Sequence, residues 1–354
     1  MKILFNILVL TLLSMISFTA HATNGVLEIN HTCAVELGCF SGDITAGYPI
    51  VIDGSAGRSY RLTSDLVIPN KDTHGIEITT SSISIDLNGF EIVSPACVGA
   101  SENCSPAAGT GSGIYVSSIS KYGISIKNGS IIGMGNHGID IKGEQSEVSG
   151  LRVRWNKGDG IHTSGFSTIS DCSAFENGIN GISSVEGSLI KNNISTLNSN
   201  EGILTSNGST IIKNTIFSNG NNGISTGTGS TVSYNTVYDN KNNGIIAFEA
   251  STIQGNTILN NTSDGINSGA GSTIIGNTVV ENRSAGIRMV SPGGLVLSNT
   301  VTKNYGWQLN LGSDIPYREN MLRRSVLPGS ILVIGGFDLG YNFCESIICS
   351  APAP

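Results

Sequence analysis

Apolar and polar residues recur along this chain with a period of 21 residues. Within a unit, one apolar residue lies two positions after a serine, another lies seven positions after it in every unit but that of Ser188, and an isoleucine follows a glycine farther along. A fixed period of this kind indicates a repeat architecture, because each unit can bury its apolar residues only against its neighbours. The seven regular units begin at Ser146, Ser167, Ser188, Ser209, Ser230, Ser251 and Ser272.

The three apolar positions of a unit predict three short inward-facing strands per turn. Ile and Thr suit a pleated surface, whereas Gly and Asn tolerate the left-handed backbone of tight turns, and the units are rich in all four. The Leu-x-x-Leu-x-Leu framework of leucine-rich repeats is missing, and strong helix formers are too scarce for helical repeats. We therefore expect an all-β, single-domain, three-sided parallel β-helix (a solenoid) of roughly ten to twelve turns.

Two asparagine columns run through the same units. A stacked amide at a corner can hydrogen-bond to the backbone and to the amide of the next turn, so we expect both columns to point inward as structural ladders. Cys172 occupies a position of the first column, which predicts a buried thiol and not a reactive one. The first column comprises Asn193, Asn214, Asn235, Asn256 and Asn277, and the second comprises Asn156, Asn177, Asn198, Asn219, Asn240, Asn261, Asn282 and Asn304.

The sequence on either side of the array predicts export and two caps. We expect residues 1–22 to be a signal peptide, because Lys2 precedes an apolar run and Ala20-His21-Ala22 forms a small-x-small cleavage site. The run is shorter than the roughly 20 residues of a membrane span, which makes an uncleaved anchor the weaker alternative. The predicted mature chain is periplasmic or extracellular and has no membrane span. Its predicted parts are an N-terminal cap with the first strands (23–74), the β-helix (75–311) and a C-terminal cap (312–354).

Six of the seven cysteines form close pairs outside the regular units. An exported protein meets an oxidising compartment, so we interpret the pairs as disulfides that staple the ends and an insertion. Zinc ligation is the alternative, but the pairs lie far apart along the chain. The expected disulfides are Cys33–Cys39, Cys97–Cys104 and Cys344–Cys349.

Charge argues against one class of partner. The chain has 19 basic and 26 acidic residues and a net charge of −7, and it lacks the basic clusters that neutralise nucleic-acid phosphates. We therefore expect no nucleic-acid partner, and the composition favours no particular oligomeric state.

The Gly-Ile column, the asparagine columns and the segment Ile-Asp-Leu-Asn-Gly-Phe at 85–90 together suggest a family. Across residues 75–311 the chain resembles the right-handed parallel β-helix proteins of the pectin-lyase-like superfamily. It resembles in particular the bacterial β-helix repeat proteins grouped with the periplasmic nitrous-oxide-reductase accessory factor. The resemblance implies a right-handed solenoid, and the superfamily's lyases, polygalacturonases, epimerases and tailspikes imply a polysaccharide as the class of partner.

One group of ionisable residues distinguishes two units from the otherwise neutral repeats. His137 and Asp159 come directly before the glycines of adjacent units, and Asp140 and His162 come two residues after those glycines. A histidine beside a carboxylate can act as a general acid or base, so these four are the candidate catalytic residues. The alternative is that they satisfy turn backbone or pair on a solvated surface. The nearby cations that could hold a uronate carboxylate are Arg152, Arg154 and Lys157.

Catalytic motifs of the resembling enzymes are absent. The chain has no Asn-Thr-Asp, Gly-His-Gly or Arg-Ile-Lys set like that of polygalacturonases, and no Asp-Pro-His-Asp like that of alginate epimerases. Between Gly138 and Asn304 no aligned column carries carboxylates on adjacent units, which argues against the calcium cluster of pectate lyases. The histidines and methionines lack the spacing of copper ligands, so we expect no metal and no other cofactor.

An aromatic column adds a candidate binding surface. It lies eight positions after the serines and is expected to face outward, where it could stack on sugar rings or be covered by the C-terminal segment. The column comprises Phe175, Phe217, Tyr238, Leu259 and Val280.

Two functions therefore remain open. The first is an exported protein that binds an extended, acidic polysaccharide along the rod and, if the histidines and aspartates are catalytic, processes it in the manner of a lyase or glycoside hydrolase. The alternative is a non-catalytic structural or surface scaffold. We favour binding, because the pattern specifies a fold and the catalytic motifs are missing.

Overall fold

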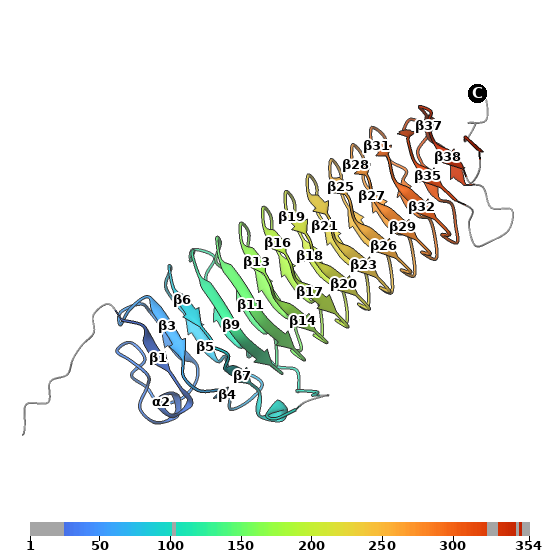
Figure 1. The fold of residues 1–354 in the computed structure, drawn as a ribbon. Coiled ribbons are helices and arrows are strands. Elements are labelled where there is room, and N and C mark those ends of the chain that lie inside the picture. The colour runs from blue at the N-terminus through green and yellow to red at the C-terminus, as the bar shows by residue number, and fades with distance from the viewer. Residues whose placement is uncertain (1–24, 101–103, 324–331, 345–346, 349–354) are drawn as a thin grey trace, which may run out of the picture.

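The protein is an elongated parallel β-solenoid (Figure 1), here in a computed structural model that describes residues 25–100, 104–323, 332–344 and 347–348. Each regular turn contributes one strand to a first sheet and two to a second sheet, and these strands lie beside their counterparts in the next turn. The prediction of a three-sided parallel β-helix is confirmed. The expected signal peptide at residues 1–22 lies outside the described residues.

The first sheet holds the residues that follow the glycines. Within the described ranges its thirteen strands pair in parallel, one per turn, and so give thirteen turns where the sequence predicted ten to twelve. The turns at the two ends keep the inward apolar residues but depart from the marker pattern, since Pro49 precedes β2 and Leu332 precedes β36 where regular turns have glycine. The strands are β2 (Ile50–Ile52), β5 (Ile76–Ile78), β8 (Ile114–Val116), β10 (Ile139–Ile141), β12 (Ile161–Thr163), β15 (Ile182–Ser184), β18 (Ile203–Thr205), β21 (Ile224–Thr226), β24 (Ile245–Ala247), β27 (Ile266–Ser268), β30 (Ile287–Met289), β33 (Leu309–Leu311) and β36 (Val333–Ile334).

The second sheet has two rows of strands, which we call the upstream and downstream rows by their order within a turn. Two eight-residue strands, β9 (Ser125–Ile132) and β11 (Glu147–Arg154), belong to both rows. The other upstream strands are β1 (Leu27–Ile29), β3 (Ser59–Leu62), β6 (Ser84–Asp86), β13 (Thr168–Ser170), β16 (Leu189–Lys191), β19 (Thr210–Ile212), β22 (Thr231–Ser233), β25 (Thr252–Gln254), β28 (Thr273–Ile275), β31 (Leu295–Leu297), β34 (Pro316–Arg318) and β37 (Phe337–Asp338). The other downstream strands are β4 (Leu66–Val67), β7 (Glu91–Val93), β14 (Ser173–Phe175), β17 (Ile194–Thr196), β20 (Thr215–Phe217), β23 (Thr236–Tyr238), β26 (Thr257–Leu259), β29 (Thr278–Val280), β32 (Thr300–Thr302), β35 (Met321–Leu322) and β38 (Phe343–Cys344).

The core is filled by the three predicted apolar columns, whose members are buried along the regular units. Ser195 is the polar exception, and its hydroxyl donates to the carbonyl of Gly202 at 2.7 Å. Both asparagine columns point inward as predicted: the Asn235 amide donates to Asn256 Oδ1 at 3.0 Å and to the Ile211 carbonyl at 2.9 Å. Because the amides satisfy backbone groups at the corners, the turns can be buried without unpaired polar atoms.

The glycine before each isoleucine is required by close approach of successive turns. A Cβ on Gly223 would lie 2.7 Å from the carbonyl oxygen of Gly244 in the next turn and 2.8 Å from the Asn240 amide nitrogen. Ordinary Cβ contacts do not come so close, so the stack can keep its spacing only if this column lacks side chains.

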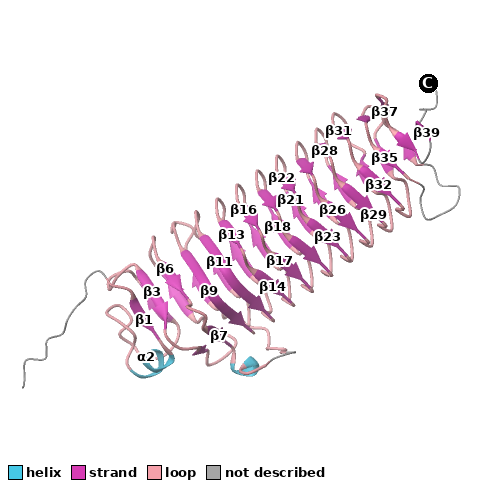
Figure 2. Ribbon diagram, viewed as in Figure 1, coloured by secondary structure: helices cyan, strands magenta, loops and turns pink. Residues whose placement is uncertain are grey.

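Short elements lie at both ends of the stack. Helix α2 (His31–Glu36) lies at the N-terminal end (Figure 2). It buries Ala34 in the core and carries one half of the Cys33–Cys39 disulfide. At the other end, β39 (Ile347–Ile348) pairs antiparallel with β38. A second disulfide joins Cys97 in the 3-10 helix Pro95–Cys97 to Cys104. Cys349, the expected partner of Cys344, lies outside the described residues.

None of the helices in the described ranges is long and apolar enough to span a membrane.

Candidate functional site

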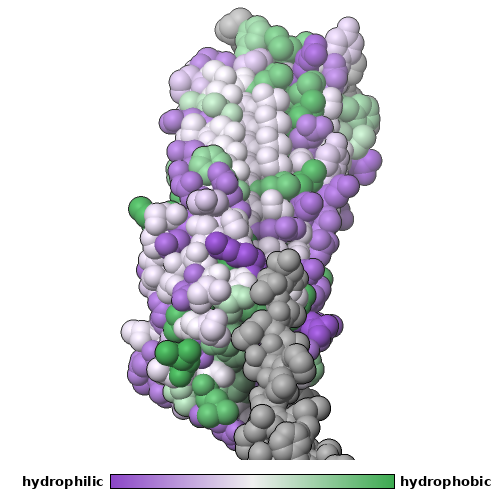
Figure 3. Space-filling model, turned by 90° about the vertical axis from the view of Figure 1, so that its left-hand side faces the viewer, coloured by the Kyte–Doolittle hydropathy of each residue, from purple (hydrophilic) through white to green (hydrophobic). Residues whose placement is uncertain are grey.

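The outer surface is built from columns of like residues, which appear as pale stripes along the rod in Figure 3. Ser, Thr and Asn dominate these columns, so charged side chains gather at few places. Two such places combine several candidate residues: a histidine cluster on the first sheet and a groove beside two arginines on the second sheet.

The residues directly before the glycines form a third polar ladder, which the sequence did not predict. In this pre-glycine ladder a side chain of one turn accepts the backbone N–H of the next turn. Asn222 Oδ1 accepts from Asn243 at 3.1 Å, and Asn243 Oδ1 accepts from Asp264 at 3.0 Å. Polar side chains along much of the rod therefore have a structural role in this ladder.

His137 and Asp159 are rungs of the pre-glycine ladder. His137 Nδ1 accepts the backbone N–H of Asp159 at 2.9 Å, and Asp159 Oδ1 accepts the backbone N–H and the side-chain amide of Asn180, both at 2.9 Å. These two candidates thus satisfy turn backbone, which is the alternative that the sequence left open. Burial lowers the pKa of His137 against the opposing attraction of Asp159.

Asp140 and His162 have no such backbone role. They are direct neighbours on β10 and β12, and the Asp140 side chain is almost completely buried although it belongs to the outer face of the sheet. Within the described part of the chain, Asp140 Oδ1 and His162 Nδ1 are buried without a hydrogen-bond partner. His162 Nδ1 lies 3.4 Å from Asp159 Oδ2, too poorly aligned for a hydrogen bond, yet this carboxylate raises the pKa of His162. Of the four candidates, Asp140 and His162 are therefore the two whose side chains are not occupied by the pre-glycine ladder.

Three further residues complete this histidine cluster. Tyr115 on β8 is the neighbour of Asp140 on the other side, and its ring stacks on His74 with centroids 4.1 Å apart. Lys142 donates to the Tyr115 hydroxyl at 3.3 Å and supplies the positive charge that acts on both His137 and His162. The sequence missed Tyr115 because the insertion at 94–112 hides its alignment with Asp140, although both follow a Gly-Ile pair.

The two histidines should give the protein opposite pH dependences, which single substitutions can separate. The pKa of His137 is lowered on folding, so its contribution is present above its ordinary value near 6.5 and is lost as the pH falls. We expect the asparagine in His137→Asn to accept the backbone N–H of Asp159, as Asn222 accepts that of Asn243. Because asparagine does not titrate, the loss of stability at low pH should disappear. The unfolding free energy of the variant minus that of wild type should therefore be larger at pH 5 than at pH 8, by about 1 kcal/mol or less. Chemical denaturation at both pH values measures this.

The control is His162→Asn, for which the sign reverses. The raised pKa of His162 contributes stability that is present below about 6.5 and is lost as the pH rises through the folded value. This variant should therefore be less stable than wild type at pH 5, and its stability should approach that of wild type at pH 8. The same pH trend in both variants would contradict the assignment of the two roles.

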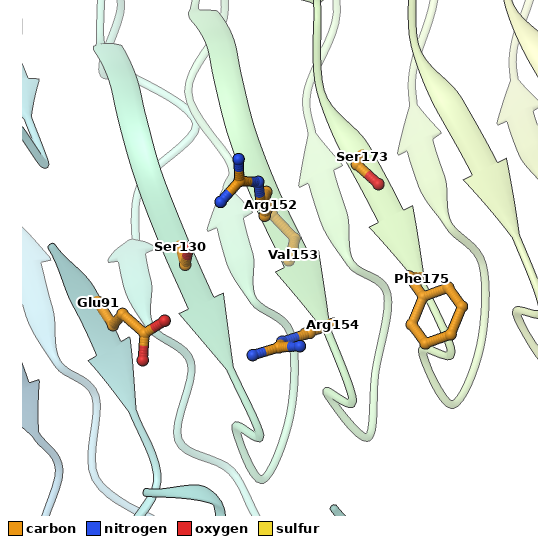
Figure 4. Close-up of a pocket in the computed structure, with 7 residues that line it drawn as sticks. All are labelled: Glu91, Ser130, Arg152, Val153, Arg154, Ser173 and Phe175. Carbon is orange, nitrogen blue, oxygen red and sulfur yellow. The ribbon is translucent and has the colours of Figure 1, made fainter. Parts of the chain in front are cut away.

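Arg152 and Arg154 lie on a different sheet from the histidine cluster. Both project outward from β11, where they line a hollow of about 260 Å³ together with Glu91, Ser130 and Phe175 (Figure 4). We call this surface the arginine groove; Val153 and Ser173 complete its lining. Lys157 belongs to neither place and lies in the corner between β11 and β12. The structure thus separates the predicted anion-binding arginines from the predicted catalytic residues.

The arginines differ in how they are held. Arg154 lies over the ring of Trp155 at 4.4 Å and donates to the carbonyl of Ala100 at 3.5 Å, so the insertion that contains Ala100 helps to place its guanidinium. Arg152 is exposed, two residues earlier on the same side of the strand. Together they present two cations with planar donor groups, which suit a carboxylate.

The aromatic column does not act as one sugar-stacking surface. Phe217 and Tyr238 stack on each other with centroids 4.8 Å apart and ring planes 2° apart. Because that distance is the spacing of turns, the rings cover each other's faces and present edges to solvent. Phe175 stands apart from this stack, and its ring lies face-on in the arginine groove (Figure 4). The C-terminal strands β34, β35, β37 and β38 extend the stack instead of folding back over the column.

Another hollow, of about 490 Å³, lies at a corner farther along the rod and is lined in part by Leu197, Asp239 and Lys241. The charges of Asp239 and Lys241 oppose each other there, so this hollow is a weaker candidate for an anionic ligand.

Comparison with known families agrees with the fold. Residues 225–323 match the right-handed β-helix region model, and residues 92–251 match the model of the periplasmic copper-binding protein NosD. A search of curated proteins found no significant match.

Several solved structures share the architecture at low sequence identity. A double mutant of the periplasmic alginate epimerase AlgG is 14% identical, with a TM-score of 0.59 over 77% of this chain and 76% of that chain. Another AlgG structure is 15% identical, with a TM-score of 0.53 over 76% and 74%. The A-module of the Azotobacter vinelandii mannuronan C-5 epimerase AlgE4 is 14% identical, with a TM-score of 0.48 over 81% and 88%. At these identities the likeness to the two AlgG structures concerns the fold alone.

The copper in the name of the NosD family can be tested against the residues present. In the described ranges, no group of three or more His, Cys, Asp or Glu side chains is arranged to hold a metal ion. His74 and His137 each use Nδ1 to accept a backbone N–H, and Met134 and Met289 are buried in the core. These residues do not fit a copper site. The solenoid, its repeat pattern and the two family matches together show that the chain is a right-handed parallel β-helix repeat protein.

Proposed function

We propose that this protein is exported and binds an acidic polysaccharide on its lateral face. The observation that carries the proposal is the arginine groove, where Arg152 and Arg154 flank a hollow that also exposes the ring of Phe175. Guanidinium groups bind carboxylates through paired hydrogen bonds, and an exposed aromatic face can stack on a sugar ring. Ser130 and Ser173 add hydroxyl groups that can bind sugar hydroxyls.

Two further observations support the proposal. The AlgG structures are of an alginate epimerase, a protein whose named substrate is a polysaccharide. The Cys33–Cys39 and Cys97–Cys104 disulfides suit an oxidising compartment outside the cytoplasm.

Binding is favoured over catalysis at this groove. The candidate catalytic residues lie on the first sheet, and His137 and Asp159 are occupied by the pre-glycine ladder. A sugar in the arginine groove would meet Glu91 as its nearest carboxylate and no histidine among the lining residues. We therefore expect little or no turnover of a polysaccharide bound there.

Binding to pectate and alginate, with a neutral glucan as reference, tests the proposal. We expect wild type to bind an acidic polymer in a salt-sensitive manner, because exposed ionic contacts are screened by salt. The Arg152→Ala, Arg154→Ala double variant should lose at least about tenfold in affinity, since each charge-assisted contact contributes more than 1 kcal/mol. Arg288→Ala is the matched control, because Arg288 is an exposed arginine on β30 of the other sheet.

Other outcomes lead to different functions. Equal loss in the Arg288→Ala control would indicate attraction by overall charge and not a site. Turnover that disappears in an Asp140→Asn, His162→Ala variant would assign catalysis to the histidine cluster. If wild type binds no glycan, the carbohydrate proposal is wrong and the alternative of a non-catalytic scaffold remains.

A further inference from the structure

The arginine groove continues into a second hollow that points to how a ligand lies on the rod. This hollow, of about 250 Å³, is lined by Gly89, Asn128, Gly129, Ser130, Gly150 and Arg152, and we call it the glycine hollow. It shares Ser130 and Arg152 with the arginine groove, so the two hollows adjoin.

The glycine hollow exists because side chains are missing at one corner of the solenoid. The four turns that follow β11 place a side chain in left-handed conformation at this corner (Asp171, Asn192, Lys213 and Tyr234), and glycine returns there farther along the rod, at Gly255 and Gly276. Gly150 occupies the equivalent position in β11, and Gly89 lies at the same corner two turns earlier with no atom within 4 Å of where a Cβ would be. Removing the side chains leaves the space open.

The strands beneath the hollows are also exceptional. β9 and β11 have eight residues, whereas every other strand in the described ranges has two to four. In the regular turns an inward asparagine separates the upstream strand from the downstream strand, but the equivalent positions here are Gly129 and Leu151. Without that rung the strand continues across the corner, and the two hollows lie on one uninterrupted pair of strands.

The line that joins the hollows follows the strands and not the rod axis. Along β11, Gly150 lines the glycine hollow, Arg152 lines both, and Arg154 lines only the arginine groove. At about 3.3 Å per residue, the two hollows are centred on the order of 10 Å apart along the strand. A ligand that fills both must therefore run across the rod.

From this arrangement, which rests on the proposed function, we propose that the protein grips a short segment of an acidic polysaccharide transversely, in two adjoining subsites that share Arg152. Neighbouring sugar residues would occupy the two hollows, with Arg152 between their acidic groups. Arg154 and Phe175 hold the residue in the arginine groove. Asn128, whose side-chain oxygen faces Gly150, offers a hydrogen-bond acceptor to the residue in the glycine hollow. The rest of the polymer leaves the protein on both sides.

Oligouronates of one to eight units, titrated by calorimetry, test this geometry. Two subsites predict an affinity that rises about tenfold from one unit to two or three and then stays constant, because further units find no charged partner. Binding along the rod would instead give an affinity that keeps rising with length. No binding at any length, including the polymer, would overturn the proposed function itself.

Substitutions at the glycine hollow give the matched comparison. Gly150→Asn places a side chain where Asn192 has one in a regular turn, and Gly89→Asn is a second variant at a position with free space. Both should retain binding of a single uronate and lose the gain on adding the second unit, whereas Arg152→Ala should weaken both. Thr236→Gln, on the downstream row far from the hollows, should change nothing. Loss of affinity in Thr236→Gln, or an unchanged gain in both glycine variants, would overturn the transverse geometry and leave polysaccharide binding in place.

Discussion

A Gly223→Ala variant is expected to lose about 3 kcal/mol of folding free energy. The added Cβ would meet the Gly244 carbonyl oxygen at 2.7 Å, and that carbonyl already accepts the N–H of Ile224 at 2.9 Å. It would also press on Val237 and on the Asn240 amide, which belongs to the second asparagine ladder. Neither backbone nor ladder can move without breaking hydrogen bonds between turns. The denaturation midpoint, followed by circular dichroism, measures the loss.

Gly229→Ala in the same part of the chain is the control. Gly229 has a φ of +70°, but nothing lies within 4 Å of its Cβ position, so the substitution costs only the left-handed conformation. We expect a loss of about 1 kcal/mol. Equal losses at the two sites would show that close packing of turns does not explain the glycine column.

Replacing Asn235 by Leu is expected to cost about 3 kcal/mol, because it removes four hydrogen bonds in mid-array. Asn235 Oδ1 accepts from the backbone and the side chain of Asn214, at 2.9 and 3.0 Å. Its amide donates to the Ile211 carbonyl and to Asn256 Oδ1. The leucine would leave buried donors on Asn214 and a buried acceptor on Ile211 unpaired. Chemical denaturation of the variant measures the effect.

Asn267→Leu provides the comparison for the ladder variant. Asn267 lies on the outer face of β27, between Ile246 and Arg288 of the neighbouring strands, and is only partly buried. Its replacement should change stability by less than about 0.5 kcal/mol. A midpoint that does not move in Asn235→Leu would contradict the structural role of the ladder.

The candidate site could be predicted in part. Sequence spacing identified His137, Asp140, Asp159 and His162 as neighbours, because residues at equal positions of adjacent units must stack. It could not reveal that His137 and Asp159 act as ladder rungs, since that depends on which nitrogen and which oxygen reach the backbone of the next turn. The spacing also marks Arg152 and Arg154 as candidates, but it does not assign their sheet, and it therefore groups them with the histidines from which the structure separates them.

The sequence by itself determined the period, the parallel solenoid, the inward columns and the asparagine ladders. Each of these follows from a local pattern that repeats, because a residue at a given position always meets the same position of the next turn. The tertiary structure alone decided the thirteen turns that the described residues form, the burial of Asp140 and the hollows around Arg152. These features arise where the repeat is broken, at the insertion of residues 94–112, at Gly89 and Gly150, and at the long strands β9 and β11. At such places the neighbours of a side chain are set by the path of the whole chain, which periodicity does not encode.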